Sequence, residues 1–265
     1  MTNQHGTPIW YELITSDVAA AEAFYGHVIG WTIADSGVPN MDYRIVTAED
    51  SEAVAGMMAR PAEMPAPPLW LFYLGVDDVD AAVEKIQAAG GSLHMPAMDV
   101  PTVGRMAMVA DPQGAPFYVM RGASDEATTA YGRMSIGHGS WHELITTDPA
   151  GAIAFYGGQF GYAKEGAMPM GPDAEYAFLK HGEGIIGAVM PTGSMEDGCW
   201  RQDPEGKPSW HFYFRVADID SARERVLAGG GQVVHGPMEV PGGEWAMNCV
   251  DPQGIAFGLV APAKS

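Results

Sequence analysis

Two glutamates stand at matching places in two similar stretches of the sequence, and their surroundings suit acid–base chemistry. Glu12 follows Trp10 by two residues, and Glu143 follows Trp141 by two residues. Because side chains alternate faces along a strand, each glutamate shares a face with its tryptophan. A carboxylate among apolar strand residues is costly unless paired, and burial commonly raises its pKa toward that of a general base. Both glutamates are therefore candidate catalytic bases, with a structural hydrogen bond or ion pair as the alternative.

Three further polar residues alternate along one expected strand. His211, Tyr213 and Arg215 share a face, and His142 stands on the opposite face of its own strand. The imidazole of His211 can form an acid–base pair with a carboxylate, and the Tyr213 hydroxyl can donate to a substrate oxygen. Arg215 can neutralise Glu143 or hold an anionic group. A structural hydrogen bond or simple packing is the alternative for His211 and Tyr213, and we expect His142 to be buried and hydrogen-bonded.

The chain that carries these residues repeats itself. Residues 10–31 return as residues 141–162, an offset of 141 − 10 = 131, and the DPQG turn at Asp111 returns at Asp251, an offset of 251 − 111 = 140. The difference, 140 − 131 = 9, is a nine-residue insertion between residues 187 and 210 of the second copy. Two copies of one unit are expected to bury a face against each other, so the site is sought in the cavities that they form.

Each copy shows the same order of elements. An apolar strand ends in an aspartate that caps a helix, Asp17 or Asp148, and a glycine ends that helix, Gly30 or Gly161. Three β segments follow, and the second half of each copy repeats this order. A βαβββ unit thus occurs four times, which predicts an α+β fold of duplicated modules with curved mixed sheets and helices outside. The expected boundaries are 6–121 for the first module, 122–137 for a linker and 138–262 for the second module.

This pattern resembles the vicinal oxygen chelate superfamily, which includes glyoxalase I, bleomycin-resistance proteins, extradiol dioxygenases and fosfomycin-resistance enzymes. The resemblance rests on the Asp-capped helix with its FY pair, the VDDVDAA segment, the Gly-Gly stop and the DPQG turn, and it covers nearly the whole chain in two copies. The WHELITTD and DPQG segments look most like two-module glyoxalase-like proteins that resemble a mycobacterial secreted antigen. The resemblance implies that each module is a half-barrel whose concave face normally carries a divalent metal that chelates two substrate oxygens.

The metal-ligand positions that the resemblance implies hold mostly other residue types. In the order first strand, central strand and last strand, these positions are Trp10, Leu71 and Tyr118 in the first module and Trp141, His211 and Gly258 in the second. Only His211 is a usual ligand, whereas a zinc, iron or manganese site needs about three. We therefore expect no resident cofactor. A displaced divalent-metal site on His211, Glu143 and Glu12 is the alternative.

Aromatic and apolar residues at these positions suit a flat or largely apolar small molecule. The candidate ligand-binding residues are Trp10, Trp141, Leu71, Tyr73, Tyr118, Arg215 and Trp200. Trp200 lies in the loop Pro191 to Pro208, which contains the insertion and whose glycines and prolines predict no regular structure. Loops of this length are often lids, so Trp200 is a candidate cover for the second module's pocket, with surface ornament as the alternative.

The composition indicates which partners and which cellular compartment to expect. The formal charge, 14 − 33 = −19, is spread over both modules and disfavours nucleic acid and anionic membranes. The sequence shows no apolar run of membrane-spanning length, and we expect no leader segment. Cys199 and Cys249 are expected to be free thiols, so we expect a cytoplasmic protein. Internal duplication supplies the pairing that single modules obtain by dimerising, which leaves a monomer or a homodimer.

Three functions remain open at this stage. The favoured hypothesis is a glyoxalase-like isomerase or lyase acting on a small, oxygenated, largely apolar compound. Glu143 or Glu12 would abstract a proton next to a carbonyl, and His211 or Tyr213 would stabilise the oxyanion. The second hypothesis is a non-catalytic protein of the resistance type that binds and sequesters a small molecule. The third is a divalent-metal-dependent lyase or dioxygenase with a displaced site.

Overall fold

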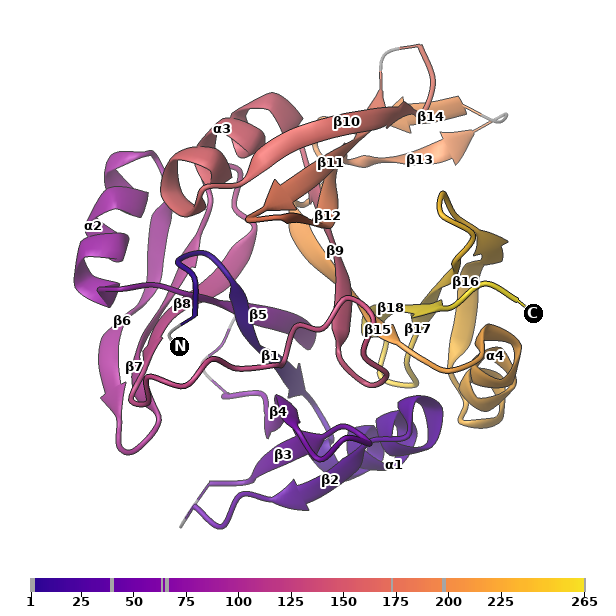
Figure 1. The fold of residues 1–265 in the computed structure, drawn as a ribbon, viewed down its shortest axis with the longest axis horizontal. Coiled ribbons are helices and arrows are strands. Elements are labelled where there is room, and N and C mark those ends of the chain that lie inside the picture. Colours follow the sequence, from indigo (N-terminus) through magenta and orange to yellow (C-terminus); the bar gives the residue numbers. More distant parts are fainter. Residues whose placement is uncertain are drawn as a thin grey trace. The chain divides into compact units, whose positions relative to one another are not determined.

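The computed structural model describes residues 3–38, 41–62, 64, 67–172, 174–196 and 199–264 (Figure 1). The elements of the first module are β1 (Pro8–Thr15), α1 (Val18–Ile29), β2 (Thr32–Asp35), β3 (Tyr43–Thr47), β4 (Ala53–Ala59), β5 (Leu69–Gly75), α2 (Val79–Ala88), β6 (Ser92–Val100), β7 (Gly104–Ala110) and β8 (Pro116–Gly122). Those of the second module are β9 (Gly139–Thr146), α3 (Pro149–Phe160), β10 (Ala163–Pro169), β11 (Glu175–His181), β12 (Gly184–Pro191), β13 (Gly193–Glu196), β14 (Cys199–Gln202), β15 (Ser209–Arg215), α4 (Ile219–Ala228), β16 (Gln232–Glu239), β17 (Trp245–Val250) and β18 (Ala256–Ala261).

Each module forms one eight-stranded mixed sheet, and the two sheets have the same topology. The strand order is β2-β3-β4-β1-β5-β8-β7-β6 in the first module and β10-β11-β12-β9-β15-β18-β17-β16 in the second. Parallel pairs join β1 to β4 and β5 to β8, and their repeats join β9 to β12 and β15 to β18. The prediction of an α+β fold built from tandem βαβββ units is confirmed.

The helices begin and end at the repeated residues that predicted them. Asp17 accepts a hydrogen bond from Ala20 N at 3.0 Å at the start of α1, and Asp148 accepts one from Gly151 N at 3.0 Å at the start of α3. Gly30 ends α1 with φ 90°, and Gly161 ends α3 with φ 74°. These left-handed conformations favour glycine, which explains why both copies stop there.

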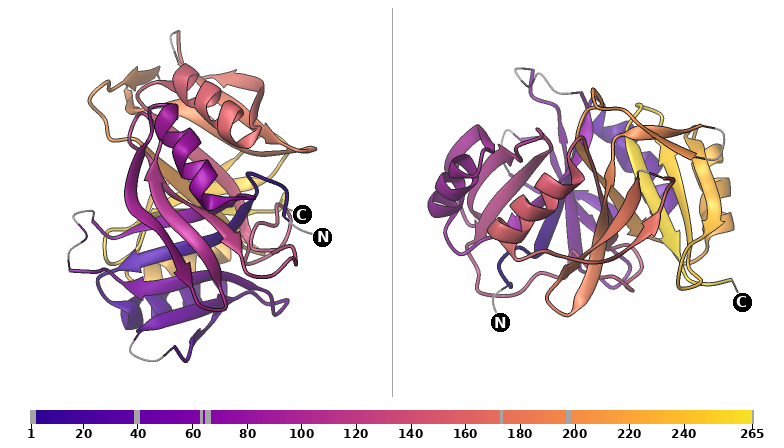
Figure 2. Two further views of the ribbon diagram at one scale, coloured as in Figure 1. Left: turned by 90° about the vertical axis from the view of Figure 1, so that its left-hand side faces the viewer. Right: turned by 90° about the horizontal axis from the view of Figure 1, so that it is seen from above.

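Contacts divide the chain into two compact units that do not coincide with the sequence repeats. Unit 1 comprises Met1–Ile9, Phe72–Thr128 and His142–Trp210, and unit 2 comprises Trp10–Leu71, Thr129–Trp141 and His211–Ser265. Each unit thus takes one βαβββ half from each module. Helices α2 and α3 pack together within unit 1, and α1 packs against α4 within unit 2. In the left view of Figure 2, α2 lies along the sheet formed by β6, β7 and β8, which it contacts.

A buried hydrogen-bond chain ties the two modules together inside unit 2. Trp70 Nε1 donates to the Tyr25 hydroxyl at 3.1 Å, and that hydroxyl donates to Asp251 of the second DPQG turn at 3.1 Å. Asp251 also accepts from the backbone N–H groups of Gln253 and Ile255. The tyrosine of the first FY pair and the aspartate of the second DPQG turn therefore serve the frame of the fold.

Unit 1 contains a matching chain of hydrogen bonds. Trp210 Nε1 donates to the Tyr156 hydroxyl at 2.9 Å, and that hydroxyl donates to Asp111 of the first DPQG turn at 3.2 Å. Burial raises the pKa of Asp111, and burial also holds the pKa of Tyr156 well above its ordinary value. The hydroxyl is therefore a permanent donor at neutral pH, and the two units are stabilised in the same way.

The prediction that the loop from Pro191 to Pro208 lacks regular structure is wrong. Strands β13 and β14 pair in an antiparallel hairpin, with Ser194 opposite Arg201. Gly193 has φ 156°, and a Cβ at this position would overlap the carbonyl of Arg201. The glycine therefore permits the close approach of two strands instead of preventing strand formation.

The two cysteines differ in what the structure describes of them. Cys249 is a buried free thiol, and burial raises its pKa to about 12. The side chain of Cys199 lies outside the described part of the chain. None of the described helices is long and apolar enough to cross a membrane.

Candidate functional site

Glu12 is held by a tyrosine of a neighbouring part of its own sheet. Its side chain on β1 is 2% exposed, and its Oε2 accepts a hydrogen bond from the Tyr43 hydroxyl on β3 at 3.1 Å. Trp10 Nε1 donates to the same hydroxyl at 3.1 Å, so Trp10 and Glu12 share a face as the alternation predicts. The intervening strand β4 has Gly56 here, where a Cβ would overlap the Tyr43 hydroxyl. The glycine makes room for the Tyr43–Glu12 pair.

Glu143 has an equivalent partner in the second module. The Tyr176 hydroxyl on β11 donates to Glu143 Oε1 on β9 at 2.5 Å, which is the length of a charge-assisted hydrogen bond. Glu143 is only partly buried, whereas Glu12 is buried. Each module therefore presents a carboxylate oriented by a tyrosine, and Glu143 is the more accessible of the two.

His211 is held by an amide on the sheet of the second module. Its Nε2 lies 3.1 Å from Asn248 Oδ1, and its ring meets the Tyr213 ring edge-on at 5.0 Å. Because the amide oxygen can only accept, the Nε2 proton donates and Nδ1 is left as the basic nitrogen. Burial lowers the pKa of His211 to about 4, so the imidazole is neutral near pH 7. Its one N–H is therefore engaged by Asn248, and Nδ1 is the nitrogen that can accept a hydrogen bond or a proton.

Tyr213 and its strand neighbours define a polar face on β15, β16, β17 and β18. Cross-strand partners share a face, and the pairing places Tyr213 opposite Gly258, Gly258 opposite Asn248 and Asn248 opposite His235. A Cβ on Gly258 would overlap the Tyr213 ring. We call the set His211, Tyr213, Arg215, His235 and Asn248 the polar face.

Arg215, at the end of β15, pairs with a carboxylate that sequence reasoning did not identify. Its Nη1 donates to Glu244 Oε1 at 2.6 Å and to the Arg133 carbonyl at 3.3 Å. Arg133, from the linker segment, donates to both oxygens of Glu244 and lies over the Trp141 ring with its guanidinium carbon 5.2 Å from the centroid. Although burial acts in the opposite direction, hydrogen bonds from Arg133 and Arg215 hold the pKa of Glu244 below its ordinary value.

The corresponding strands of the first module carry different chemistry. Tyr73 on β5 stacks on Tyr118 on β8, with ring centroids 4.3 Å apart and planes 7° apart. The pairing then places Tyr118 opposite Met108 and Met108 opposite Met95 in one row, and Met120, Met106 and Met98 in the next. We call Tyr73, Tyr118 and these five methionines the methionine face. Leu71, earlier on β5, is buried.

His142 is buried as expected and plays a structural part. Its Nδ1 lies 2.8 Å from the carbonyl oxygen of Ile186 on β12, and its ring packs against Phe72. Burial lowers its pKa to about 4. The alternation of faces along β9 therefore separates this packed histidine from Glu143.

Trp200 lies in the hairpin, on β14. Its backbone N–H donates to the carbonyl of Met170 at 3.0 Å, which connects the hairpin to the end of the β10 region. Its indole Nε1 is buried and has no hydrogen-bond acceptor among the residues that the structure describes. Its role as a cover for a ligand stays a prediction.

The residues at the family's metal positions do not fit a metal. Trp10, Leu71 and Trp141 have no donor atom for a cation, Tyr118 stacks on Tyr73, and His211 alone supplies one ligand where about three are needed. Within the described ranges, no three or more His, Cys, Asp or Glu side chains are placed to hold one ion.

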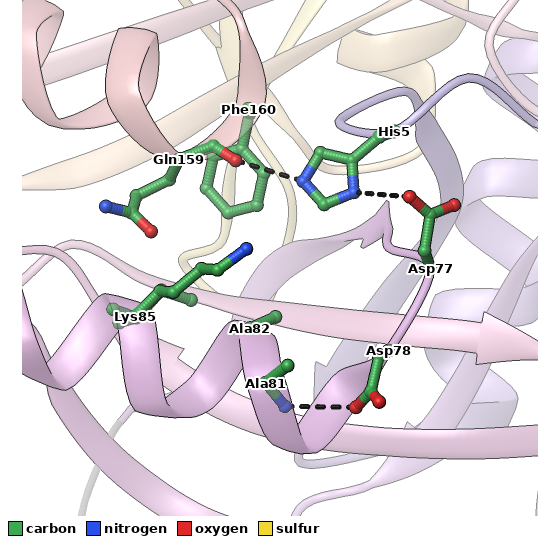
Figure 3. Close-up of a pocket in the computed structure, with 9 residues that line it drawn as sticks. His5, Asp77, Asp78, Ala81, Ala82, Lys85, Gln159 and Phe160 are labelled. Carbon is green, nitrogen blue, oxygen red and sulfur yellow. Dashed lines mark hydrogen bonds and ion pairs between the residues drawn. The ribbon is translucent and has the colours of Figure 1, made fainter.

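A small cavity of about 90 Å³ lies between the start of α2 and the end of α3 in unit 1 (Figure 3). His5 Nε2 donates to the Gln159 carbonyl at 3.0 Å, and His5 Nδ1 lies 3.6 Å from Asp77. Lys85 points into the same space in Figure 3. Sites for drug-sized ligands are roughly 300–1,000 Å³, and this cavity contains none of the predicted site residues, so it is not the candidate site.

Tyr43, Tyr176, Asn248 and Glu244 are the functional partners that sequence reasoning missed. Each lies on a strand or turn remote in sequence from the residue that it contacts. A tyrosine near the start of the third strand of each module, at 43 and 176, was the only signal that could have indicated the two glutamate partners.

Comparison with known proteins places this geometry in context. A model of the Glyoxalase/Bleomycin resistance protein/Dioxygenase superfamily matches residues 7–119 and 135–259, once in each module. The sequence is 35% identical over 266 residues to CFP32 of Mycobacterium tuberculosis, covering 98% of this chain and 96% of that protein, which carries a provisional assignment as a glyoxylase. It is 30% identical over 271 residues to the anthracycline biosynthesis protein DauV of Streptomyces sp. strain C5, covering 96% and 93%.

Solved structures share the fold at low sequence identity. The Mn(II)-bound glyoxalase from Novosphingobium aromaticivorans matches with a TM-score of 0.64 at 18% identity, covering 99% of this chain and 84% of that one. The 2,3-dioxygenase LapB from Pseudomonas sp. KL28 matches with a TM-score of 0.65 at 13% identity, covering 98% and 94%. At these identities the likeness shows the fold alone.

Proposed function

Because the chain belongs to the glyoxalase/bleomycin resistance protein/dioxygenase superfamily, we propose that it is an enzyme that moves a proton on a small oxygenated compound. The reaction is of the isomerase or lyase class, and Glu143 is its general base. The single observation that carries this proposal is the 2.5 Å hydrogen bond from the Tyr176 hydroxyl to Glu143. A carboxylate that is oriented in this way and only partly buried can reach a substrate proton.

The preference for Glu143 over Glu12 rests on access. Glu12 is 2% exposed and sits beneath Tyr43 and Trp10, so a substrate carbon would have to displace packed aromatic groups to reach it. Glu143 has the same kind of tyrosine partner but is less buried. Glu12 is the alternative base.

His211 and Tyr213 are the proposed groups that stabilise negative charge on a substrate oxygen. With a pKa of about 4, His211 is uncharged near neutrality, so its one N–H, on Nε2, has to turn from Asn248 to the substrate oxygen to stabilise that charge. Tyr213 supplies a hydroxyl donor on the same face of β15. Each is tested by its own variant, His211→Leu or Tyr213→Phe, which we expect to slow turnover about 10- to 100-fold.

The relatives support a flat, oxygenated substrate. CFP32 is provisionally assigned as a glyoxylase, and DauV is named for anthracycline biosynthesis. An anthracycline is a flat, oxygenated and largely apolar ring system, which is the ligand class that aromatic side chains suit. Trp10, Trp141 and Tyr118 are the proposed contacts for such rings.

The test is a deuterium-exchange screen followed by a matched variant. A panel of α-hydroxyketones, 2-oxoaldehydes and hydroxyquinones is incubated with the protein in D₂O, and deuterium uptake next to the carbonyl is followed by NMR. We expect enzyme-dependent uptake in at least one compound, and a loss of about 10³-fold or more in Glu143→Gln, whose ligand binding is retained. Uptake that is unchanged in Glu143→Gln would remove this residue from the mechanism.

A second candidate function is the binding and sequestration of an apolar ligand without turnover. The methionine face favours it, because thioethers and stacked tyrosines make an adaptable, polarizable surface. Calorimetry with a compound that is recovered chemically unchanged, together with no deuterium uptake in any panel member, would favour this function over the enzyme.

A metal-dependent reaction at a displaced site is the third possibility and has a direct test. The residues at the family's metal positions do not fit an ion, so we expect protein purified without chelator or affinity tag to contain less than stoichiometric zinc, manganese, iron or nickel. Treatment with EDTA should leave deuterium uptake unchanged. Stoichiometric metal with loss of uptake on chelation would restore this possibility.

The proposal extends to partner and compartment. A small molecule is the proposed partner, since a net charge of −19 opposes binding to nucleic acid. The buried free thiol of Cys249 agrees with a reducing compartment, so we propose a cytoplasmic location for a monomer or homodimer.

A further inference from the structure

Two arginines share one carboxylate in unit 2. Arg133 Nη2 donates to Glu244 Oε2 at 2.5 Å, and Arg215 Nη1 donates to Glu244 Oε1 at 2.6 Å. No other carboxylate of the described residues lies within ion-pair distance of either guanidinium. We call Arg133, Arg215, Glu244 and Trp141 the arginine cluster.

The arginine cluster carries one uncompensated positive charge. Two guanidiniums and one carboxylate sum to +1, in a chain whose net charge is −19. Arg215 is 1% exposed, so water screens it poorly and it needs a fixed partner, which is Glu244. Arg133 has to share that partner, and its side chain is 33% exposed, so it can reach an anion that arrives from solution.

An aromatic surface lies against the available guanidinium. The Arg133 guanidinium carbon lies 5.2 Å from the centroid of the partly buried Trp141 ring. The Nη1 and Nη2 atoms of Arg133 already donate to Glu244, so its Nε edge is the side left for a second carboxylate, and an indole face suits a flat ring. Together they fit a flat molecule with a carboxylate at its edge.

The fold itself does not require this cluster. The offset of 140 places Gly75 at the position of Arg215 and Gly104 at the position of Glu244, and Arg133 belongs to the linker, which has no counterpart. The first module nevertheless forms the same eight-stranded sheet. A role in folding alone therefore does not explain a buried arginine at this place in the second module.

We propose that the arginine cluster is a subsite for the carboxylate of a flat aromatic ligand, and that Arg133 determines this specificity. The inference rests on the proposed function in one respect, because it assigns a charged group to that function's substrate. The carboxylate binds Arg133 alongside Glu244, and the ring of the ligand lies against Trp141.

Benzoate and its neutral isostere benzamide are the probes that test the charge requirement. Calorimetry in a buffer of low ionic strength without chloride should show benzoate binding at least about tenfold more tightly than benzamide, the ratio expected for one charge-assisted hydrogen bond. Equal binding of the two probes, or binding of neither, would overturn the proposal.

Matched variants then test whether Arg133 is the residue that binds the carboxylate. Arg133→Gln should weaken benzoate binding about tenfold or more and leave benzamide binding unchanged, and Arg133→Lys should lose less. Arg121→Gln is the control, because Arg121 is an exposed arginine whose ion pair is with Asp125. Unchanged benzoate affinity in a folded Arg133→Gln protein contradicts the proposal, and so does an equal loss in Arg121→Gln.

Failure of this inference can be separated from failure of the proposed function. Glu143→Gln should bind benzoate like the wild type while losing deuterium uptake. If Glu143→Gln loses deuterium uptake but the wild type does not prefer benzoate to benzamide, only the carboxylate subsite is contradicted. If the wild type binds benzoate selectively but promotes no deuterium uptake, only the proposed reaction is contradicted.

Discussion

The methionine face of the first module and the polar face of the second occupy the same strands of the same fold, yet their chemistry is opposite. At an offset of 140, Tyr118 becomes Gly258, Met108 becomes Asn248 and Met95 becomes His235. In the neighbouring row, Gly75 becomes Arg215. The first face offers thioethers and stacked rings, and the second offers hydrogen-bonding and charged groups.

The frame beneath these faces has not diverged in the same way. The Trp70–Tyr25–Asp251 chain and the Trp210–Tyr156–Asp111 chain have the same donors, acceptors and distances within a few tenths of an ångström. The two modules have thus kept the same buried hydrogen bonds, whereas the residues on one face of the sheet differ between them. The difference agrees with the proposal that the reactive groups lie in the second module.

The largest expected loss of stability tests whether the two buried hydrogen-bond chains contribute equally to the free energy of unfolding. Asp111→Ala and Asp251→Ala each remove a buried acceptor of backbone N–H groups and of a tyrosine hydroxyl. We expect each variant to lose about 3 kcal/mol or more of the free energy of unfolding, since buried donors left without partners cost about 1–3 kcal/mol each. Urea denaturation measures both, and a large loss in one with little in the other would break the symmetry.

Exchanging one residue between the faces comes next. Met108→Asn places an amide at a buried methionine position, and we expect it to lower the free energy of unfolding by about 2–3 kcal/mol. Asn248→Met removes the acceptor of His211 and should cost about 1–2 kcal/mol. Thermal unfolding measures both variants. Neutral results for both would mean that the two faces are interchangeable.

A smaller effect is expected in the pH dependence of stability, and its direction follows from the pKa of His211. The pKa of His211 is about 4 in the folded chain and about 6.5 in an unfolded one. Between these values the unfolded state binds more protons, so stability falls as pH falls, by up to about 1.4 kcal/mol per pH unit for this residue. His211→Leu, which installs the residue of the first module, should remove that share.

The pH experiment has an internal control. His142 has the same lowered pKa of about 4 and is fully packed in unit 1, so its contribution should persist in His211→Leu. Urea denaturation at pH 7, 6 and 5 supplies the comparison. An identical slope in wild type and His211→Leu would mean that His211 titrates normally in the folded protein.

Much of the fold was readable from the sequence because it depends on local signals. Asp17 and Gly30 mark the ends of α1 through capping and a left-handed turn, and their repeats do the same for α3. The alternation along β1 correctly placed Trp10 and Glu12 together, as their common contact with Tyr43 shows. The hairpin β13–β14 was missed because Gly193 serves a close strand approach that glycine content alone does not reveal.

The partners of the site residues could not be predicted for a physical reason. Tyr43 shifted by 131 is Ala174, whereas the actual partner of Glu143 is Tyr176. Register shifts in β10–β11 and β11–β12 displace the pairing, so a fixed offset does not identify it. Glu244 lies in the turn between β16 and β17, and its contact with Arg215 depends on how that turn folds back.

The most direct test of the division between modules compares Glu143→Gln with Glu12→Gln in the deuterium-exchange assay. Each variant removes one carboxylate charge and keeps a group that the partner tyrosine can contact. We expect Glu143→Gln to lose about 10³-fold or more of the uptake rate and Glu12→Gln to keep a rate within about tenfold of wild type. Loss in Glu12→Gln with retained uptake in Glu143→Gln would place the chemistry in the first module and contradict this expectation.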